Sequence, residues 1–93
     1  MTWAPAVPRS WAEEPGRPAT NMNDLRDKLD HLASLVGVHS SEGLALKLLR
    51  NAILEGEKVA YSLELLSRTM GDTDCGRWVA TAAEDAELLE GDY

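Results

Sequence analysis

The sequence predicts an all-α protein, a small bundle of three helices in which a long central helix is flanked by two shorter ones. Three observations lead to this prediction. Apolar residues recur at alternating four- and three-residue steps in three stretches, glycines and helix-capping residues stand at the borders of those stretches, and all four prolines precede residue 20. We therefore expect an extended N-terminal arm over residues 1–20 and a single helical domain over residues 21–93.

The arm contains the four prolines and two of the three tryptophans, and its apolar residues follow neither a helical nor a strand period. Such a segment has a stiffened backbone and no apolar face of its own to bury. Trp3 and Trp11 are costly to leave in water, because each can bury on the order of 200 Å². Two interpretations stay open: the tryptophans anchor the arm in pockets on the body or on a neighbouring subunit, or the arm is a disordered leader.

The first helix is expected over about residues 23–36. Asn21 or Asn23 can cap its N-terminus, Asp24 suits the positive end of the helix dipole, and Gly37 is a favourable C-terminal cap. Its apolar residues step by four, three and four: Leu25, Leu29, Leu32 and Val36.

The central helix is expected over about residues 41–70, beginning after a Ser40 or Ser41 cap. Its apolar stripe keeps phase throughout: Ala45, Leu49, Ala52, Gly56, Val59, Leu63, Leu66 and Met70. Gly56 interrupts the helical composition, but its neighbours supply no turn residues and no new N-cap, and one internal glycine costs only about 1 kcal/mol. We predict one continuous helix; a kink or hinge at Gly56 is the alternative.

The third helix is expected over about residues 74–90, after a break at Gly71 and a cap at Thr73 or Asp74, with Gly91 as its stop. Its apolar residues are Cys75, Val79, Ala82, Ala86 and Leu89. The two short helices together match the length of the central one. We therefore expect them to fold back over its two halves and to cover its main apolar seam.

A second apolar stripe lies away from that seam. Leu54, Tyr61 and Leu65 cluster on a face of the central helix that is otherwise mostly charged. Such a minor stripe suits a partly polar second contact, so these three residues are candidate partner-binding residues and predict a homo-oligomer or a subunit of an assembly.

The formal net charge of −7 comes largely from the C-terminal end. Glu84, Asp85 and Glu87 fall in the last turns of the third helix, where the helix dipole disfavours anions. They are candidate contacts for a basic partner, or they mimic nucleic acid toward a DNA-binding protein; a frayed helix end is the other interpretation. The negative charge disfavours non-specific nucleic-acid binding by this chain.

Residue patterns for chemistry are missing from the sequence. Asp27 with His31, and His39 with Glu42, fall short of the three or four ligands that a metal site needs. Cys75 is the single cysteine and lacks a nearby activating base. We find no cofactor motif, no secretory signal and no membrane-spanning stretch. The sequence predicts a protein that is not an enzyme, binds no cofactor or metal, and is cytoplasmic.

One stretch resembles a known family. Leu32, Ala33, Val36, Gly37 and Val38, followed by Ser40 and Ser41, are similar to the helix-turn-helix of DNA-binding regulators. The resemblance implies a transcriptional regulator whose second helix enters the major groove. The sequence departs from that pattern at Gly43, where the family has a buried aliphatic residue, and offers only Lys47 and Arg50 to reach DNA.

These observations together favour a non-catalytic protein–protein interaction module. It would serve as a structural or adaptor subunit of a larger assembly, or as a small regulator that acts by binding another protein. A helix-turn-helix DNA-binding regulator is the alternative.

Overall fold

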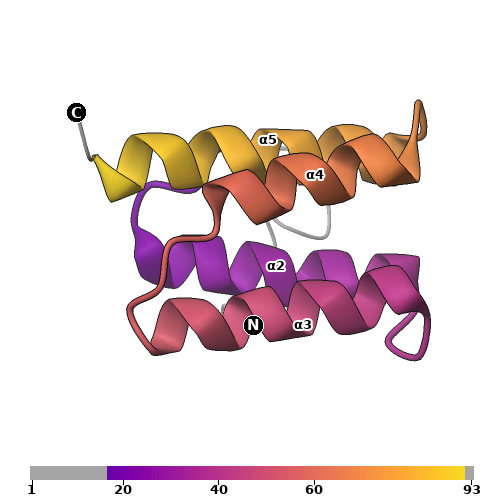
Figure 1. Ribbon diagram of the computed structural model, residues 1–93, viewed down its shortest axis with the longest axis horizontal. Helices are drawn as coiled ribbons and strands as arrows, with labels where there is room; N and C mark the ends of the chain where they lie inside the picture. The colour runs from indigo at the N-terminus through magenta and orange to yellow at the C-terminus, as the bar shows by residue number, and fades with distance from the viewer. Residues whose placement is uncertain (1–16, 92–93) are drawn as a thin grey trace, which may run out of the picture.

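Four α-helices make up the described part of the chain, residues 17–91 of a computed structural model. They are α2 (Met22–Val36), α3 (Ser41–Leu54), α4 (Ala60–Met70) and α5 (Asp74–Glu90). The helices run alternately in opposite directions and form a bundle (Figure 1). The predicted all-α class is confirmed, and no strand occurs in these residues.

Local capping signals begin three of the four helices where the sequence predicts. Asn21, Ser40 and Thr73 stand before α2, α3 and α5, and each side-chain oxygen accepts a hydrogen bond from the backbone N–H three residues later, at 2.8 to 3.0 Å. Each bond satisfies one of the N–H groups that a helix leaves without an internal partner. The predicted first helix, about residues 23–36, and the predicted third helix, about residues 74–90, are therefore confirmed as α2 and α5.

The predicted continuous central helix is wrong, because the chain turns back at Gly56. Gly56 has a φ of +82°, a left-handed conformation that only glycine adopts without strain. Its N–H donates to the Ile53 carbonyl at 3.0 Å, and the Glu57 N–H donates to the Ala52 carbonyl at 2.9 Å. This pair of bonds is the Schellman motif that closes a helix C-terminus. The glycine is therefore the stop signal of α3.

The start of α4 explains why the sequence around the break lacks a cap. Val59 precedes the helix and offers no side-chain cap. Its backbone N–H instead donates to Oε2 of Glu90, at the far end of α5, at 2.7 Å. A distant carboxylate thus satisfies the Val59 N–H at the start of α4, and a new helix begins there without a local side-chain cap.

The core is supplied unequally by the four helices. Helices α2 and α5 bury most of their inner faces, whereas α3 buries Gly43 and Leu46, and α4 buries Leu63 with Val59 just before it. Leu49 and Leu66 pack against the core but stay partly exposed. The expected pairing is confirmed, because α2 packs against the first half of the seam, in α3, and α5 against the second half, in α4. The reversal at Gly56 also brings the two halves of the seam beside each other, with Leu49 and Leu66 only partly buried.

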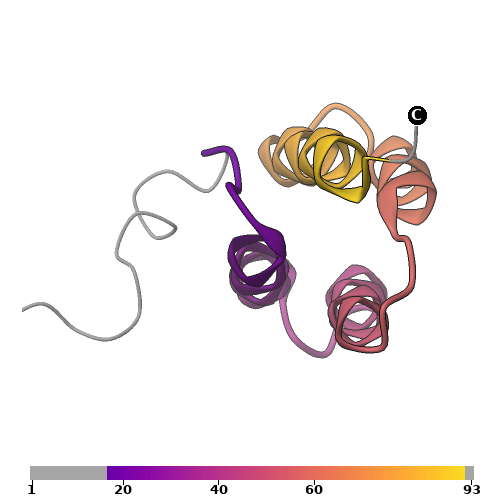
Figure 2. The same ribbon diagram turned by 90° about the vertical axis from the view of Figure 1, so that its left-hand side faces the viewer.

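The two helical hairpins, α2–α3 and α4–α5, repeat one pattern. The apolar positions 25, 29, 32 and 36 before Gly37 match 59, 63, 66 and 70 before Gly71. After the caps at residues 40 and 73, positions 43, 46, 49 and 53 match 76, 79, 82 and 86. Equivalent helices run in the same direction at diagonal corners of the bundle (Figures 1 and 2). The α2–α5 seam is therefore the internal equivalent of the α3–α4 seam.

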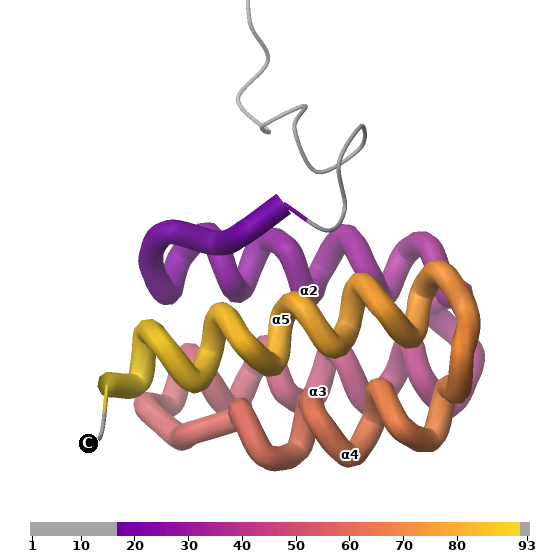
Figure 3. Tube along the Cα trace, turned by 90° about the horizontal axis from the view of Figure 1, so that it is seen from above, coloured from indigo at the N-terminus to yellow at the C-terminus, as the bar shows by residue number. Residues whose placement is uncertain are grey.

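The end of the predicted arm that the structure describes, residues 17–20, lies against the body. It runs back along α2 (indigo in Figure 3), and Ala19 is buried. Residues 1–16, with Trp3 and Trp11, lie outside the described residues, so the predicted anchors stay predictions.

Candidate protein-interaction surface

The α3–α4 seam is the line along which α3 and α4 face each other. Contacts on the opposite flank of each helix show which residues lie along it. On α3, Arg50 pairs with Asp30 of α2 at 2.5 Å, so this flank faces α2. On α4, Glu64 and Arg68 line a groove shared with α5. Helix periodicity then places Leu49 and Leu66 on the two flanks that face each other. Among the neighbouring helix pairs, α3 and α4 pack least closely.

Four large apolar residues lie exposed on the outer side of this seam. Leu44 and Leu48 are one turn apart on α3, and Tyr61 and Leu65 are one turn apart on α4. Leu48 is 68% exposed and Tyr61 is 72% exposed. We call these four residues the α3–α4 face. Two of them, Tyr61 and Leu65, were predicted as partner-binding residues from the sequence; Leu44 and Leu48 were missed.

The internal repeat shows that the fold does not require apolar residues at these positions. The equivalent positions of α2 and α5 carry polar side chains: Asp27, His31, Arg77 and Thr81. Both halves have the same helix pattern, yet at these four equivalent positions only the α3–α4 half carries exposed apolar residues; the exposed Leu35 of α2 and Leu88 of α5 stand at other positions of the pattern. Isolated exposed leucines are ordinary in soluble proteins, but a patch confined to one of two equivalent faces indicates a contact surface.

The α2–α5 seam is closed by a buried ion pair. Nζ of Lys28 lies 2.7 Å from Oδ2 of Asp85, and the two residues are 1% and 6% exposed. Lys28 also donates to the Arg17 carbonyl at 2.9 Å, and the Ala19 N–H donates to Asp85 at 2.9 Å. The pair therefore joins α2, α5 and residues 17–19 in one network.

The equivalent positions on the α3–α4 seam are Ser62 and Ala52. Ser62 is exposed and Ala52 is partly exposed. Both side chains are small and uncharged, so this seam lacks the ion pair that closes its counterpart. A partner can approach it without removing a charge from water at these two positions.

Asp85 does not lie on the acidic surface where the sequence placed it. The carboxylate points into the bundle and accepts two hydrogen bonds there. Helix periodicity explains the difference: Asp85 falls on the inner face next to Ala82 and Ala86, which are fully buried. Lys28, its partner, was missed because 57 residues separate the two in the chain.

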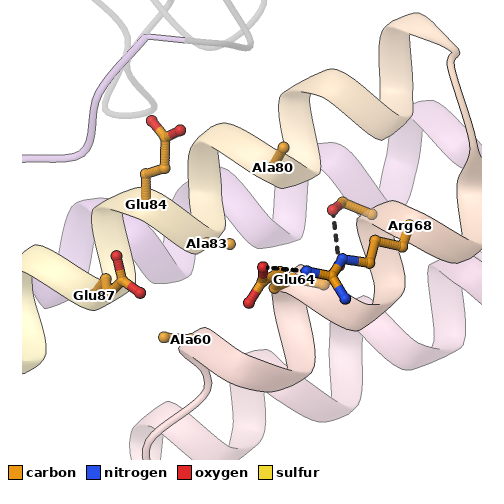
Figure 4. A pocket seen from close by; sticks show the side chains of 8 residues that line it. Ala60, Glu64, Arg68, Ala80, Ala83, Glu84 and Glu87 are labelled. Atoms are coloured by element: carbon orange, nitrogen blue, oxygen red, sulfur yellow. Dashed lines mark hydrogen bonds and ion pairs between the residues drawn. The ribbon is translucent and has the colours of Figure 1, made fainter.

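The other acidic candidates, Glu84 and Glu87, are exposed on α5. Figure 4 shows them at the edge of a groove between α4 and α5 of about 350 Å³, lined by small residues and by the Glu64–Arg68 ion pair. Because α5 runs antiparallel to α4, its acidic end lies near the N-terminus of α4. Carboxylates are favourable near that positive helix end, as the Glu90 contact illustrates.

Leu54, the remaining candidate, is 60% exposed at the C-terminus of α3. Its helical position lies on the flank nearer α2, away from Leu48 and Leu65. The structure therefore divides the predicted trio: Tyr61 and Leu65 share a face, and Leu54 stands apart from it.

Groups that could perform chemistry are sparse in the described part of the chain. No cluster of three potential metal ligands occurs in residues 17–91. The Thr20 hydroxyl donates to Asp24 at 2.6 Å and holds the pKa of that carboxyl below its ordinary value. None of the described helices has the length and apolar character needed to cross a membrane.

The segment that resembles a helix-turn-helix forms an antiparallel hairpin. Helices α2 and α3 lie side by side (Figure 1), whereas helix-turn-helix motifs cross at about 90–120°. Arg50 is held by Asp30. Comparison with family models, curated proteins and solved structures found no match to this chain.

Proposed function

We propose that this protein is a non-catalytic protein–protein interaction module, a structural or adaptor subunit or a small regulator, and that it binds through the α3–α4 face. The observation that carries the proposal is the contrast between the two equivalent halves. Leu44, Leu48, Tyr61 and Leu65 are exposed where the other half has four polar residues.

The size of the face supports a specific contact. If a fully exposed large apolar residue presents about 200 Å², the exposed fractions of the four side chains amount to roughly 500 Å². This lies within the range of the largest apolar patches on monomeric proteins, which are often functional. A stable interface buries about 800 Å² per partner, so the face supplies its apolar centre and the surrounding residues its polar rim.

Site-specific photo-crosslinking in the native host tests the proposal. A photoreactive amino acid replaces Leu48 or Leu65 in the full chain, and Leu88, which is 79% exposed on α5, serves as the matched control. We expect discrete cross-linked protein products from positions 48 and 65 and only background from position 88. Equal background from all three positions would contradict the proposal.

A further inference from the structure

We propose that the occupant of the α3–α4 face is a second copy of this chain, packed face to face about a two-fold axis. This inference rests on the proposed function and names its partner. Three observations support it: the distribution of charge, the composition of the face, and the incomplete burial of α3 and α4.

Charge favours this face as the one through which two copies approach. Residues 41–70, which form α3, α4 and their connection, contain four acidic and four basic residues. The other described residues, 17–40 and 71–91, contain nine acidic residues against four basic ones. Two copies of a chain with a net charge of −7 repel each other least when their neutral halves meet and their acidic halves point apart.

The composition of the face suits self-association. In a two-fold interface each contact between two residues occurs twice, so a surface must complement itself. An antiparallel arrangement sets the Leu44–Leu48 pair of one copy against the Tyr61–Leu65 pair of the other. Ser62 and Ala52 in the seam are small and uncharged, so the helices can approach closely. A face of this kind leaves no unpaired charge at the centre of the interface.

The burial of the bundle gives the third reason. Helices α2 and α5 have their own closing network, formed by Lys28, Asp85 and residues 17–19. Leu49 and Leu66 of the open seam remain partly exposed. A small domain gains most from covering such residues, because its own core is limited. A second copy on the α3–α4 face would cover the α3–α4 seam, as the Lys28–Asp85 network covers the α2–α5 seam.

Analytical ultracentrifugation of the full chain tests this inference. We expect a species of twice the 10.2 kDa chain mass at micromolar to about 100 µM protein. Leu48→Glu and Leu65→Glu should each weaken dimerisation by about 100-fold or more, because each change acts twice in a two-fold interface. Leu88→Glu is the matched control and should leave the dissociation constant unchanged. An unaltered circular dichroism spectrum and urea midpoint in each variant would show that the bundle stays folded.

The outcomes separate the inference from the proposed function. A wild-type chain that stays monomeric up to about 100 µM overturns the second copy as partner, and so does a dimer that tolerates both Leu48→Glu and Leu65→Glu. In those cases a cross-linked product of any other mass from positions 48 and 65 leaves the proposed function standing. A wild-type dimer lost in both variants, together with a cross-linked product of twice the chain mass, supports the inference.

Discussion

Replacing Lys28 by methionine removes one member of the buried ion pair while keeping a side chain of similar length. The Asp85 carboxylate, 6% exposed, would keep the Ala19 N–H but lose the ammonium group 2.7 Å away. Breaking a buried pair in this way costs about 3–5 kcal/mol, because the remaining charge is left without compensation in the interior. A described domain of this length has a total stability of roughly 4–11 kcal/mol, at 0.05–0.15 kcal/mol per residue. We therefore expect Lys28→Met to remove about a quarter or more of the stability.

Urea unfolding followed by circular dichroism measures this effect. With a slope of about 1 kcal/mol per molar urea for so small a domain, the midpoint should fall by about 3–5 M. Since the single variant can fail to fold, the double variant Lys28→Met with Asp85→Leu completes the test. Removing both charges should recover about 2 kcal/mol of the loss and leave a cost of about 1–3 kcal/mol, because the buried Ala19 N–H then lacks its acceptor.

The control is Arg77→Met. Arg77 is an exposed residue paired with Asp72 at 3.4 Å, and its loss should change the free energy of unfolding by less than about 1 kcal/mol. A loss of less than about 1 kcal/mol for Lys28→Met itself would refute the reasoning, as would a double variant that is no more stable than the single one.

Three further predictions concern the connection, the cap of α4 and the start of α2. Gly56→Ala should lower the free energy of unfolding by about 1–2 kcal/mol, because the residue has a φ of +82°. The space around an added Cβ is open, so the cost comes from the backbone conformation and not from a clash. An unchanged or higher urea midpoint would favour a continuous helix instead. Glu90→Ala should lower the free energy of unfolding by about 1 kcal/mol, because the Val59 N–H loses its acceptor. Glu87→Ala is the exposed control, and equal effects in both variants would argue against a capping role for Glu90. In the folded protein Asp24 has a pKa below its ordinary value of 3.8. Its contribution to stability is therefore complete above pH 3.8 and is lost as the pH falls through the lower folded value. Asp24→Asn should remove this part of the acid sensitivity, which a titration of the urea midpoint between neutral and acidic pH would detect.

Local signals account for the elements that the sequence predicts correctly. The caps of α2, α3 and α5 are short-range hydrogen bonds between a side chain and the backbone three residues later. Gly37, Gly71 and Gly91 all have positive φ at helix ends, as their positions after apolar runs suggest. The places where these helices begin and end can therefore be predicted from residues close together in the chain.

The sequence also holds a signal for the break at Gly56. The spacing 59, 63, 66, 70 repeats the spacing 25, 29, 32, 36, and Leu25 lies in the first turn of its helix. Comparing the two runs would have assigned Val59 to a helix start. The residues next to Gly56 do not reveal the start of α4, because the group that satisfies the Val59 N–H is Glu90, which is distant in the chain.

The candidate interaction surface was predicted in part. Tyr61 and Leu65 stood out as exposed apolar residues on a charged helix. Leu44 and Leu48 belong with them only because the chain reverses at Gly56 and brings α4 beside α3. Within one continuous helix the two pairs would lie at different heights along its axis.

The sequence by itself determined the helical class, the capped starts of α2, α3 and α5 and the apolar faces, because capping and periodicity act within a few residues. Tertiary structure alone decided which faces meet. It buried Asp85 against Lys28, and it left the four residues of the α3–α4 face exposed. The physical reason is that burial and ion pairing depend on residues that become neighbours only when the hairpins pack, so a side chain's place along the chain does not reveal its partner.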